Sequence, residues 1–187
     1  GQGAMVASFH PLQTFPDSVD PITRLEGIGF AVTGDPRLVN WLQDVVVSVG
    51  GVKLSINDDV RSLYHASAVM VCGYMLTALQ HALKLWEQLN VSNEDALKAL
   101  IPLMRATIDN AERYGVQESV TGPIVRGDVS TVEGHLESLQ GLDGDSLEFY
   151  AFLGRHSVRC NETNVELAAN IKHQIDDLLR AHLKSVG

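Results

Sequence analysis

The segment between Ala66 and Leu79 is apolar on nearly every side of a helix, and no other feature constrains the fold as strongly. Asn57 or Asp58 can cap a helix that includes this segment and runs to about Leu89. Large apolar side chains cover more than one face of that helix: Val69, Met70, Val71, Tyr74, Met75, Leu76 and Leu79. Such a helix is normally surrounded by other helices or by a partner chain. We therefore expect a mainly α fold, with a bundle of helices around one long central helix.

Short apolar runs near the start of the chain are typical of strands. The strands are expected at 5–9, 27–33 and 52–56, with a helix from Asp35-Pro36 to about Val49. Asp35 can cap that helix, and proline suits its first position. This β-α-β-like arrangement has too few strands for an independent doubly wound sheet.

The rest of the chain has the pattern of helices joined by short connections. Ser92 and Asp95 can form a capping box for a helix that ends near Gly115. Pro102 should bend or interrupt that helix because it removes a backbone donor. Residues 116–127 are expected to form a loop. Further helices are expected from Asp128 to about Leu139, from Ser146 to Arg159 and from Glu162 to Lys184.

Charge and cysteine content narrow the classes of function. The chain has 14 basic and 23 acidic residues, and this net charge of −9 argues against a nucleic-acid partner, because binding phosphates requires a basic face. Cys72 and Cys160 lack the spacing of metal ligands, which indicates two reduced thiols in the cytoplasm. No uninterrupted apolar run reaches the roughly 18 residues of a membrane span. We therefore expect a cytoplasmic protein with no membrane partner and no secretory signal.

The loop that ends at Asp128 holds the best candidate for a ligand contact. Gly122 and Gly127 free the backbone around Arg126, and Pro123 stiffens the turn. Because Asp128 can cap the following helix, this setting can aim the Arg126 guanidinium at a carboxylate or a phosphate. In the alternative, Arg126 pairs with Asp128 or Glu133 and only holds the loop together.

Two histidines are candidate acid–base residues. His10 follows an expected strand, and open α/β sheets bind ligands at the carboxyl ends of their strands. His65 lies beside Tyr64 near the start of the long helix. Histidine side chains can exchange protons near neutral pH, which suits general acid–base catalysis. In the alternative, His10 bonds a loop carbonyl and His65 is a core residue whose hydrogen bonds are satisfied.

The remaining histidines indicate no metal centre. The chain has seven: His10, His65, His81, His135, His156, His173 and His182. None belongs to an HxH or HExxH motif or to a compact Cys/His pair, so we predict no metal. His135 lies about two helical turns after Asp128 and can support the ligand loop or simply face solvent. No serine or cysteine lies in a nucleophile elbow.

Three motifs occur in an order that resembles one family. They are Phe9-His10-Pro11-Leu12-Gln13-Thr14-Phe15, Tyr64-His65-Ala66-Ser67-Ala68 and Thr121-Gly122-Pro123-Ile124-Val125-Arg126-Gly127-Asp128. Together they resemble the Rossmann-like oxidoreductases that bear the C-terminal domain of unknown function 2520. The resemblance implies an N-terminal dinucleotide-binding domain and a helical domain similar to the C-terminal halves of 6-phosphogluconate dehydrogenase, ketopantoate reductase and pyrroline-carboxylate reductase. It also implies a dimer formed by the helical half and an active site in the interdomain cleft.

The sequence departs from this family's pattern at two points. A GxGxxG loop followed by a helix is absent, since Gly27 and Gly29 lie in a strand pattern without a third glycine. Cys72-Gly73 stands where the family tends to carry Ser-Asn. We therefore expect residues 1–56 to be the trailing edge of a Rossmann-like domain and 57–187 to be a helical substrate-binding and dimerisation domain.

Two hypotheses of function follow. In the first, the chain is the C-terminal portion of an NAD(P)-dependent oxidoreductase that acts as a homodimer on a small anionic metabolite, with NAD(P) bound by the full-length protein and not by this chain alone. Its catalytic candidates are His65 and His10, and its substrate-binding candidates are Arg126, Thr121, Gly122, Asp128 and His135. In the second, the chain is a stand-alone, non-catalytic helical module for ligand binding or dimerisation.

Overall fold

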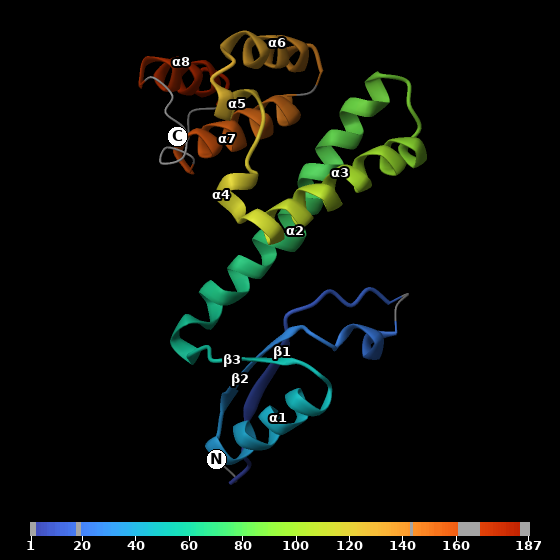
Figure 1. Ribbon diagram of the computed structural model, residues 1–187, viewed down its shortest axis with the longest axis vertical. Coiled ribbons are helices and arrows are strands. Elements are labelled where there is room, and N and C mark those ends of the chain that lie inside the picture. The colour runs from blue at the N-terminus through green and yellow to red at the C-terminus, as the bar shows by residue number, and fades with distance from the viewer. Residues whose placement is uncertain (1–2, 18–19, 143, 161–168, 184–187) are drawn as a thin grey trace. The chain divides into compact units, whose positions relative to one another are not determined.

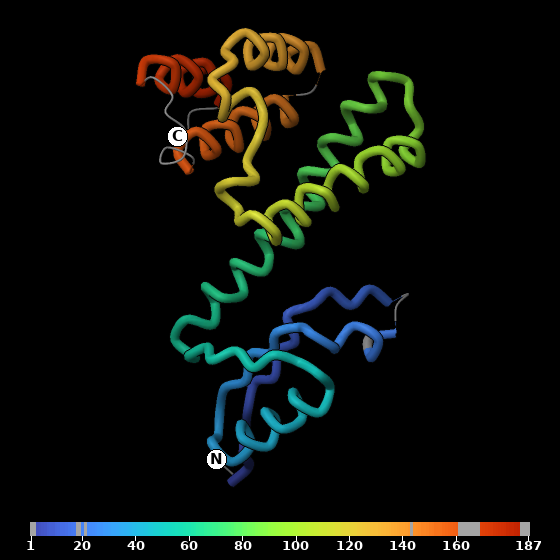
Figure 2. The backbone as a smooth tube through the Cα atoms, in the orientation of Figure 1, coloured from blue at the N-terminus to red at the C-terminus, as the bar shows by residue number. Residues whose placement is uncertain are grey.

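The computed structural model describes residues 3–17, 20–142, 144–160 and 169–183. The chain forms two compact units, residues 1–82 and 83–187 (Figure 1). A small sheet comes first and helices follow, which confirms the mainly α fold. The long helix α2 (Arg61–Gln88) contributes to both units, as the continuous backbone trace in Figure 2 shows.

The first unit contains a three-stranded sheet in the order β1-β2-β3. Its elements are β1 (Ala7–Pro11), a 3₁₀ turn η1 (Pro21–Arg24), β2 (Gly29–Gly34), α1 (Pro36–Ser48) and β3 (Val52–Leu54). β1 is antiparallel to β2, and β2 is parallel to β3, so β2, α1 and β3 form the β-α-β unit. α1 packs against the sheet, and its Val46 forms a buried cluster with Phe30 and Val32.

Local chemistry accounts for the ends of these elements. The Asp35 carboxylate accepts the Arg37 amide at 3.0 Å, which confirms the predicted cap of α1. Gly50, at φ +73°, adopts the left-handed conformation that follows many helices. β1 begins and ends two residues later than predicted and includes His10, because Pro11 is tolerated at the end of an edge strand.

The start of the long helix differs from the prediction. A 3₁₀ turn, η2 (Asp58–Val60), precedes α2, and the Asn57 side chain makes no capping hydrogen bond. The Asp58 carboxylate also leaves the helix uncapped, because it accepts the Thr33 hydroxyl at 2.7 Å. Asn57 therefore occupies the predicted position before the helical segment, but its side chain does not make the predicted capping hydrogen bond.

The apolar surface of α2 is not covered within the chain. None of its residues is buried, and the side chains of Met70 and Val71 are 63% and 72% exposed. By length and composition alone, Asp58–Gln88 could cross a membrane, although no uninterrupted apolar run of that length was expected. The sequence pattern predicts a covered helix, whereas the large apolar side chains of α2 are exposed in this structure.

The second unit consists of helices with one buried cluster. They are α3 (Asn93–Tyr114), α4 (Val116–Ser119), α5 (Pro123–Arg126), α6 (Val129–Gln140), α7 (Gly144–Cys160) and α8 (Ala169–Arg180). The cluster joins α6, α7 and α8 through Val132, Leu136, Ala151, Ile175 and Leu179. Arg155 of α7 and Asp176 of α8 add a bidentate ion pair, with N–O distances of 2.7 and 3.1 Å.

The helix predictions for this unit are partly confirmed. The Ser92 hydroxyl accepts the Asp95 amide at 3.2 Å and donates to the Asp95 carboxylate at 2.8 Å, which caps α3 as predicted. α3 continues through Pro102 without interruption. Residues 116–127 form the short helices α4 and α5 instead of an entirely irregular loop. The helix predicted over 162–184 is described only as α8, and residues 161–168 and 184–187 lie outside the described residues.

Candidate functional site

The two faces of the β1–β2 pair differ in chemistry. Ser8 lies opposite Thr33 and His10 lies opposite Ala31, so these four side chains share one face. The other face carries Phe30 and packs into the apolar cluster with α1. Because Ala31 is small, space remains beside the His10 imidazole.

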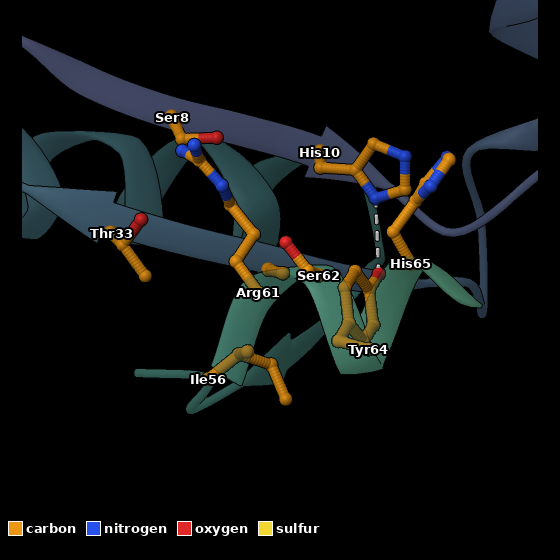
Figure 3. A pocket seen from close by; sticks show the side chains of 9 residues that line it. Ser8, His10, Thr33, Ile56, Arg61, Ser62, Tyr64 and His65 are labelled. Atoms are coloured by element: carbon orange, nitrogen blue, oxygen red, sulfur yellow. Dashed lines mark hydrogen bonds between the residues drawn. The ribbon is translucent and has the colours of Figure 1, made fainter. Parts of the chain in front are cut away.

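The first two turns of α2 complete a cavity over this polar face. Its lining residues are Ser8, His10, Ala31, Thr33, Ile56, Arg61, Ser62, Tyr64 and His65, and its volume is about 330 Å³. Figure 3 shows the strand residues and the helix residues around this space. Helical spacing places Arg61, Tyr64 and His65 on one side of α2, because residues three and four apart lie on the same face. The volume lies within the range of sites for small molecules.

His10, Tyr64 and His65 form a cluster of neighbouring rings in the cavity. His10 Nδ1 and the Tyr64 hydroxyl are 3.1 Å apart, as the dashed line in Figure 3 marks. The His10 and Tyr64 rings meet edge to face, with centroids 5.5 Å apart, and the His10 and His65 centroids are 6.1 Å apart. Desolvation raises the pKa of Tyr64, so its phenol stays protonated at neutral pH.

A second cavity of about 230 Å³ shares His10 and His65 with the first. Its other lining residues come from the segment after β1 and from the next turns of α2: Leu12, Gln13, Thr14, Ala68, Val69, Val71 and Cys72. The two imidazoles therefore line both spaces. A ligand that spanned both spaces would place its middle against the imidazoles.

Arg61 supplies the positive charge of the larger cavity. Its Nη1 atom is 3.9 Å from the Asp58 carboxylate, and both side chains are more than 60% exposed. Such a long and solvated pair contributes little attraction. The same carboxylate accepts the Thr33 hydroxyl, which connects α2 to β2 through η2.

The predicted ligand loop belongs to the second unit. Gly122 and Gly127 have φ angles of 111° and 73°, which shows the backbone freedom that the sequence predicts. Arg126 is exposed and makes no hydrogen bond or ion pair with the residues that the structure describes. Thr121 precedes this turn and is also exposed. The alternative in which Arg126 forms an ion pair with Asp128 is not observed, although its charge lies close enough to influence that carboxylate.

Asp128 and His135 make local contacts. The Asp128 carboxylate caps α6 by accepting the Thr131 hydroxyl at 2.7 Å and the Thr131 amide at 3.1 Å. These bonds and that from the Ser130 hydroxyl, with the Arg126 charge, lower the pKa of Asp128. His135 Nδ1 is 2.9 Å from the Tyr150 hydroxyl and links α6 to α7.

The structure brings together only part of the predicted set. His10 and His65 share one site in the first unit, whereas Arg126, Asp128 and His135 belong to the second unit. Sequence reasoning assigned no role to Tyr64 and overlooked the other polar residues of the cavity: Ser8, Thr33, Arg61 and Ser62. The period of two along β1 and the spacing of three to four along α2 could have indicated them.

The described residues do not fit a dinucleotide. The turn from β2 into α1 is Gly34-Asp35-Pro36, and the Asp35 carboxylate occupies the helix N-terminus where a pyrophosphate would lie. Gly29 does not free a phosphate cradle, because a Cβ there would lie 2.6 Å from Leu54 Cδ1. No group of three or more potential metal ligands occurs among the described residues.

Comparison with known proteins identifies the fold and the family. The chain is similar to protein TM1727 from Thermotoga maritima, with 22% identity, a TM-score of 0.71, and coverage of 84% of this chain and 62% of that one. It is also similar to a protein from Bacteroides fragilis named putative NADP oxidoreductase BF3122, with 20% identity, a TM-score of 0.69, and coverage of 83% and 58%. The chain thus spans about three fifths of the length of these structures.

The family model gives the more specific assignment. None of the curated proteins compared with the chain matches it. The model of the domain of unknown function DUF2520 matches residues 28–157, which include β2, α2 and the loop before α6. Because this match covers more than half of the sequence, the chain belongs to the DUF2520 family.

Proposed function

We propose that the chain is the substrate-side portion of an NAD(P)-dependent oxidoreductase, with His10 and His65 as its acid–base residues. The observation that carries the proposal is the convergence of His10, Tyr64 and His65 on one cavity. The name of the Bacteroides fragilis neighbour supports redox chemistry and NADP as the cofactor. Since the described residues do not fit a dinucleotide, the cofactor would bind to residues outside this chain.

The chemistry of the histidine site suits proton transfer to a substrate oxygen. A carbonyl that is reduced to an alcohol takes up one proton at its oxygen. The hydrogen bond between His10 Nδ1 and the Tyr64 hydroxyl orients the imidazole and leaves its Nε2 atom available to the substrate. In its imidazolium form, His10 would give the Nε2 proton to the substrate oxygen, become neutral and take up its next proton from solvent, and His65 would orient or polarise the same group.

The second unit would contribute to substrate binding through its ligand loop. The exposed guanidinium of Arg126 has no ion-pair partner among the described residues and can take a carboxylate or phosphate of the metabolite. Thr121, Gly122 and Asp128 would shape the turn, and His135 would hold α6 against α7 through Tyr150 without contacting the substrate. Substitution of Arg126 by Ala should weaken binding of the anionic substrate without unfolding the protein.

The redox proposal is tested by turnover in the polypeptide as its gene encodes it. Oxidation of NADPH and NADH is measured with a panel of small carbonyl compounds that carry a carboxylate or a phosphate. His65→Gln should reduce kcat by about a hundredfold, because it removes an acid–base group. His173→Gln, at an exposed position of α8, is the matched control and should keep its activity. Absence of turnover, or equal losses in the two variants, would contradict the proposal.

A second candidate function is a non-catalytic dimerisation module. Exposed apolar side chains along α2 favour it: Leu63, Met70, Val71, Tyr74 and Leu76. A second copy could bury this surface, as in the proposed likeness to the helical half of 6-phosphogluconate dehydrogenase. A cytoplasmic location is part of this proposal, and two free cysteines suit such a reducing compartment.

Dimerisation is tested by light scattering at micromolar concentration. Met70→Glu should convert the dimer to a monomer, because it places a charge in the apolar surface. Val47→Glu changes an equally exposed apolar side chain of α1 and should leave the dimer intact. A monomeric wild-type chain, or recovery of the chain with lipid vesicles instead of in a dimer, would contradict this candidate.

A further inference from the structure

The side chains that line the larger cavity include a positively charged group but no acidic group. Its lining contains one guanidinium, two imidazoles and four hydroxyls, and none of the nine lining residues carries a carboxylate. The nearest acidic group is Asp58, whose carboxylate already accepts the Thr33 hydroxyl and lies 3.9 Å from Arg61. The polar lining of the cavity therefore offers a ligand one positive charge and several groups that can donate hydrogen bonds, and no negative charge.

Several of these donors have no other partner among the described residues. The hydroxyls of Ser8 and Ser62 make no hydrogen bond there, and the exposed ion pair with Asp58 leaves most of the Arg61 donors unused. In Figure 3 the Arg61 side chain extends toward Ser8 across the space in front of Thr33. A guanidinium fork beside free hydroxyls is complementary to the oxygens of a carboxylate or phosphate.

We infer that this cavity is an oxyanion site, in which Arg61 holds a carboxylate or phosphate with the help of Ser8 and Ser62. The inference rests on the proposed function in one respect, because the anion would belong to the substrate whose reacting group meets His10 and His65. An anion at Arg61 fixes one end of the ligand, and the two histidines line the same cavity. Arg61 is thus an anchor that shares a cavity with the acid–base residues.

The test measures anion binding by the chain itself at low ionic strength. Inorganic phosphate and acetate are titrated separately at pH 8, where ordinary imidazoles are neutral, and the Nε–H resonances of the arginines are followed by NMR. The Arg61 resonance should shift and saturate with at least one of the two anions. Saturation with phosphate alone assigns a phosphate site, and saturation with acetate alone or with both assigns a carboxylate-compatible site.

Variants distinguish specific anion binding in the cavity from non-specific attraction of anions to exposed arginines. Arg61→Gln should weaken binding of the effective anion by at least about tenfold, because it removes charge-assisted hydrogen bonds. Ser8→Ala should weaken it by a smaller factor. Arg37→Gln removes an exposed arginine of α1, on the other side of the sheet, and should leave the affinity unchanged.

Three results would overturn the inference: no saturable shift with either anion, unchanged affinity in Arg61→Gln, or equal losses in Arg61→Gln and Arg37→Gln. Failure of the redox proposal would give a different set of results. In that case the histidine variants would have no effect on turnover while phosphate or acetate still bound at Arg61. The two proposals can therefore fail independently.

Discussion

Two histidine–tyrosine pairs in this chain have nearly the same geometry in different surroundings. In the first unit, His10 and Tyr64 are 3.1 Å apart, with ring centroids at 5.5 Å and an interplanar angle of 89°. In the second unit, the corresponding values for His135 and Tyr150 are 2.9 Å, 5.8 Å and 88°. The first pair lines a cavity with a second imidazole, whereas the second connects α6 to α7 beside a packed core.

This contrast teaches that the geometry of the pair does not by itself indicate a function. Tyr150 packs against the apolar cluster of the second unit, where its hydroxyl gains a partner and its ring adds buried area. Tyr64 lies on a helix with no buried residue, and its partner His10 comes from a different segment of the chain. We therefore infer a functional role for the first pair and a structural role for the second.

The largest difference between the pairs should appear on loss of the phenol hydroxyl. Tyr64→Phe should lower kcat about tenfold and alter the pH profile, because His10 loses the group that sets its tautomer. Tyr150→Phe should leave kcat unchanged and lower the free energy of unfolding by about 1 kcal/mol. Steady-state kinetics and urea unfolding of both variants measure the contrast. A reversed pattern would assign the functional role to the second pair.

Two helical glycines sharpen the contrast between an open and a packed region. At Gly154 of α7, a Cβ would lie 3.0 Å from Leu179 and 3.1 Å from Ile124, whereas at Gly73 of α2 only Val69 lies within reach, at 3.7 Å. Among the described residues, no side chain from another element therefore packs closely against Gly73. Gly154→Ala should lower the free energy of unfolding by about 1 kcal/mol through overpacking.

In Gly73→Ala, the free energy of unfolding should instead rise by about 0.5–1 kcal/mol, because alanine favours a helix and meets open space. Thermal and urea unfolding of both variants provide the comparison. A rise in the free energy of unfolding of Gly154→Ala would show that α7 and α8 can accommodate the added methyl group. A destabilised Gly73→Ala would place a second copy against that part of α2.

The smallest expected effect concerns acid stability of the packed region. The hydrogen bonds from Arg155 lower the pKa of Asp176, so the stabilisation is present above the usual carboxyl pKa and is lost as the pH falls through the lowered value. Asp176→Asn should cost about 1 kcal/mol or less at pH 7, because the pair is partly solvated. The difference from wild type should vanish in strongly acidic solution. A difference that stayed constant with pH would contradict this role of the ion pair.

Local signals in the sequence predicted much of the fold. Asp35, Ser92 and Asp128 each cap the helix expected of them, since a cap depends on residues within one turn. The start of α2 could not be predicted in this way. Asp58 is held by Thr33, which lies 25 residues earlier on β2, and that contact overrides the local preference for a cap.

The candidate site was only partly predictable, because its residues meet through contacts between segments that are distant in the sequence. His10 and His65 stand out by residue type, but their proximity depends on the packing of α2 near β1. Ser8 and Thr33 become neighbours only through the antiparallel register of β1 and β2. Arg61 could not be predicted as a site residue, because a single arginine near a helix start is usually a solvated surface residue.

The central claim, that the pair in the first unit is functional and its counterpart is structural, is tested most directly by one ratio of turnover numbers. His10→Gln and His135→Gln are compared in the NADPH oxidation assay, each normalised to wild type. The account predicts a loss in kcat of about a hundredfold for His10→Gln and less than about twofold for His135→Gln. Equal losses, or a larger loss for His135→Gln, would contradict it.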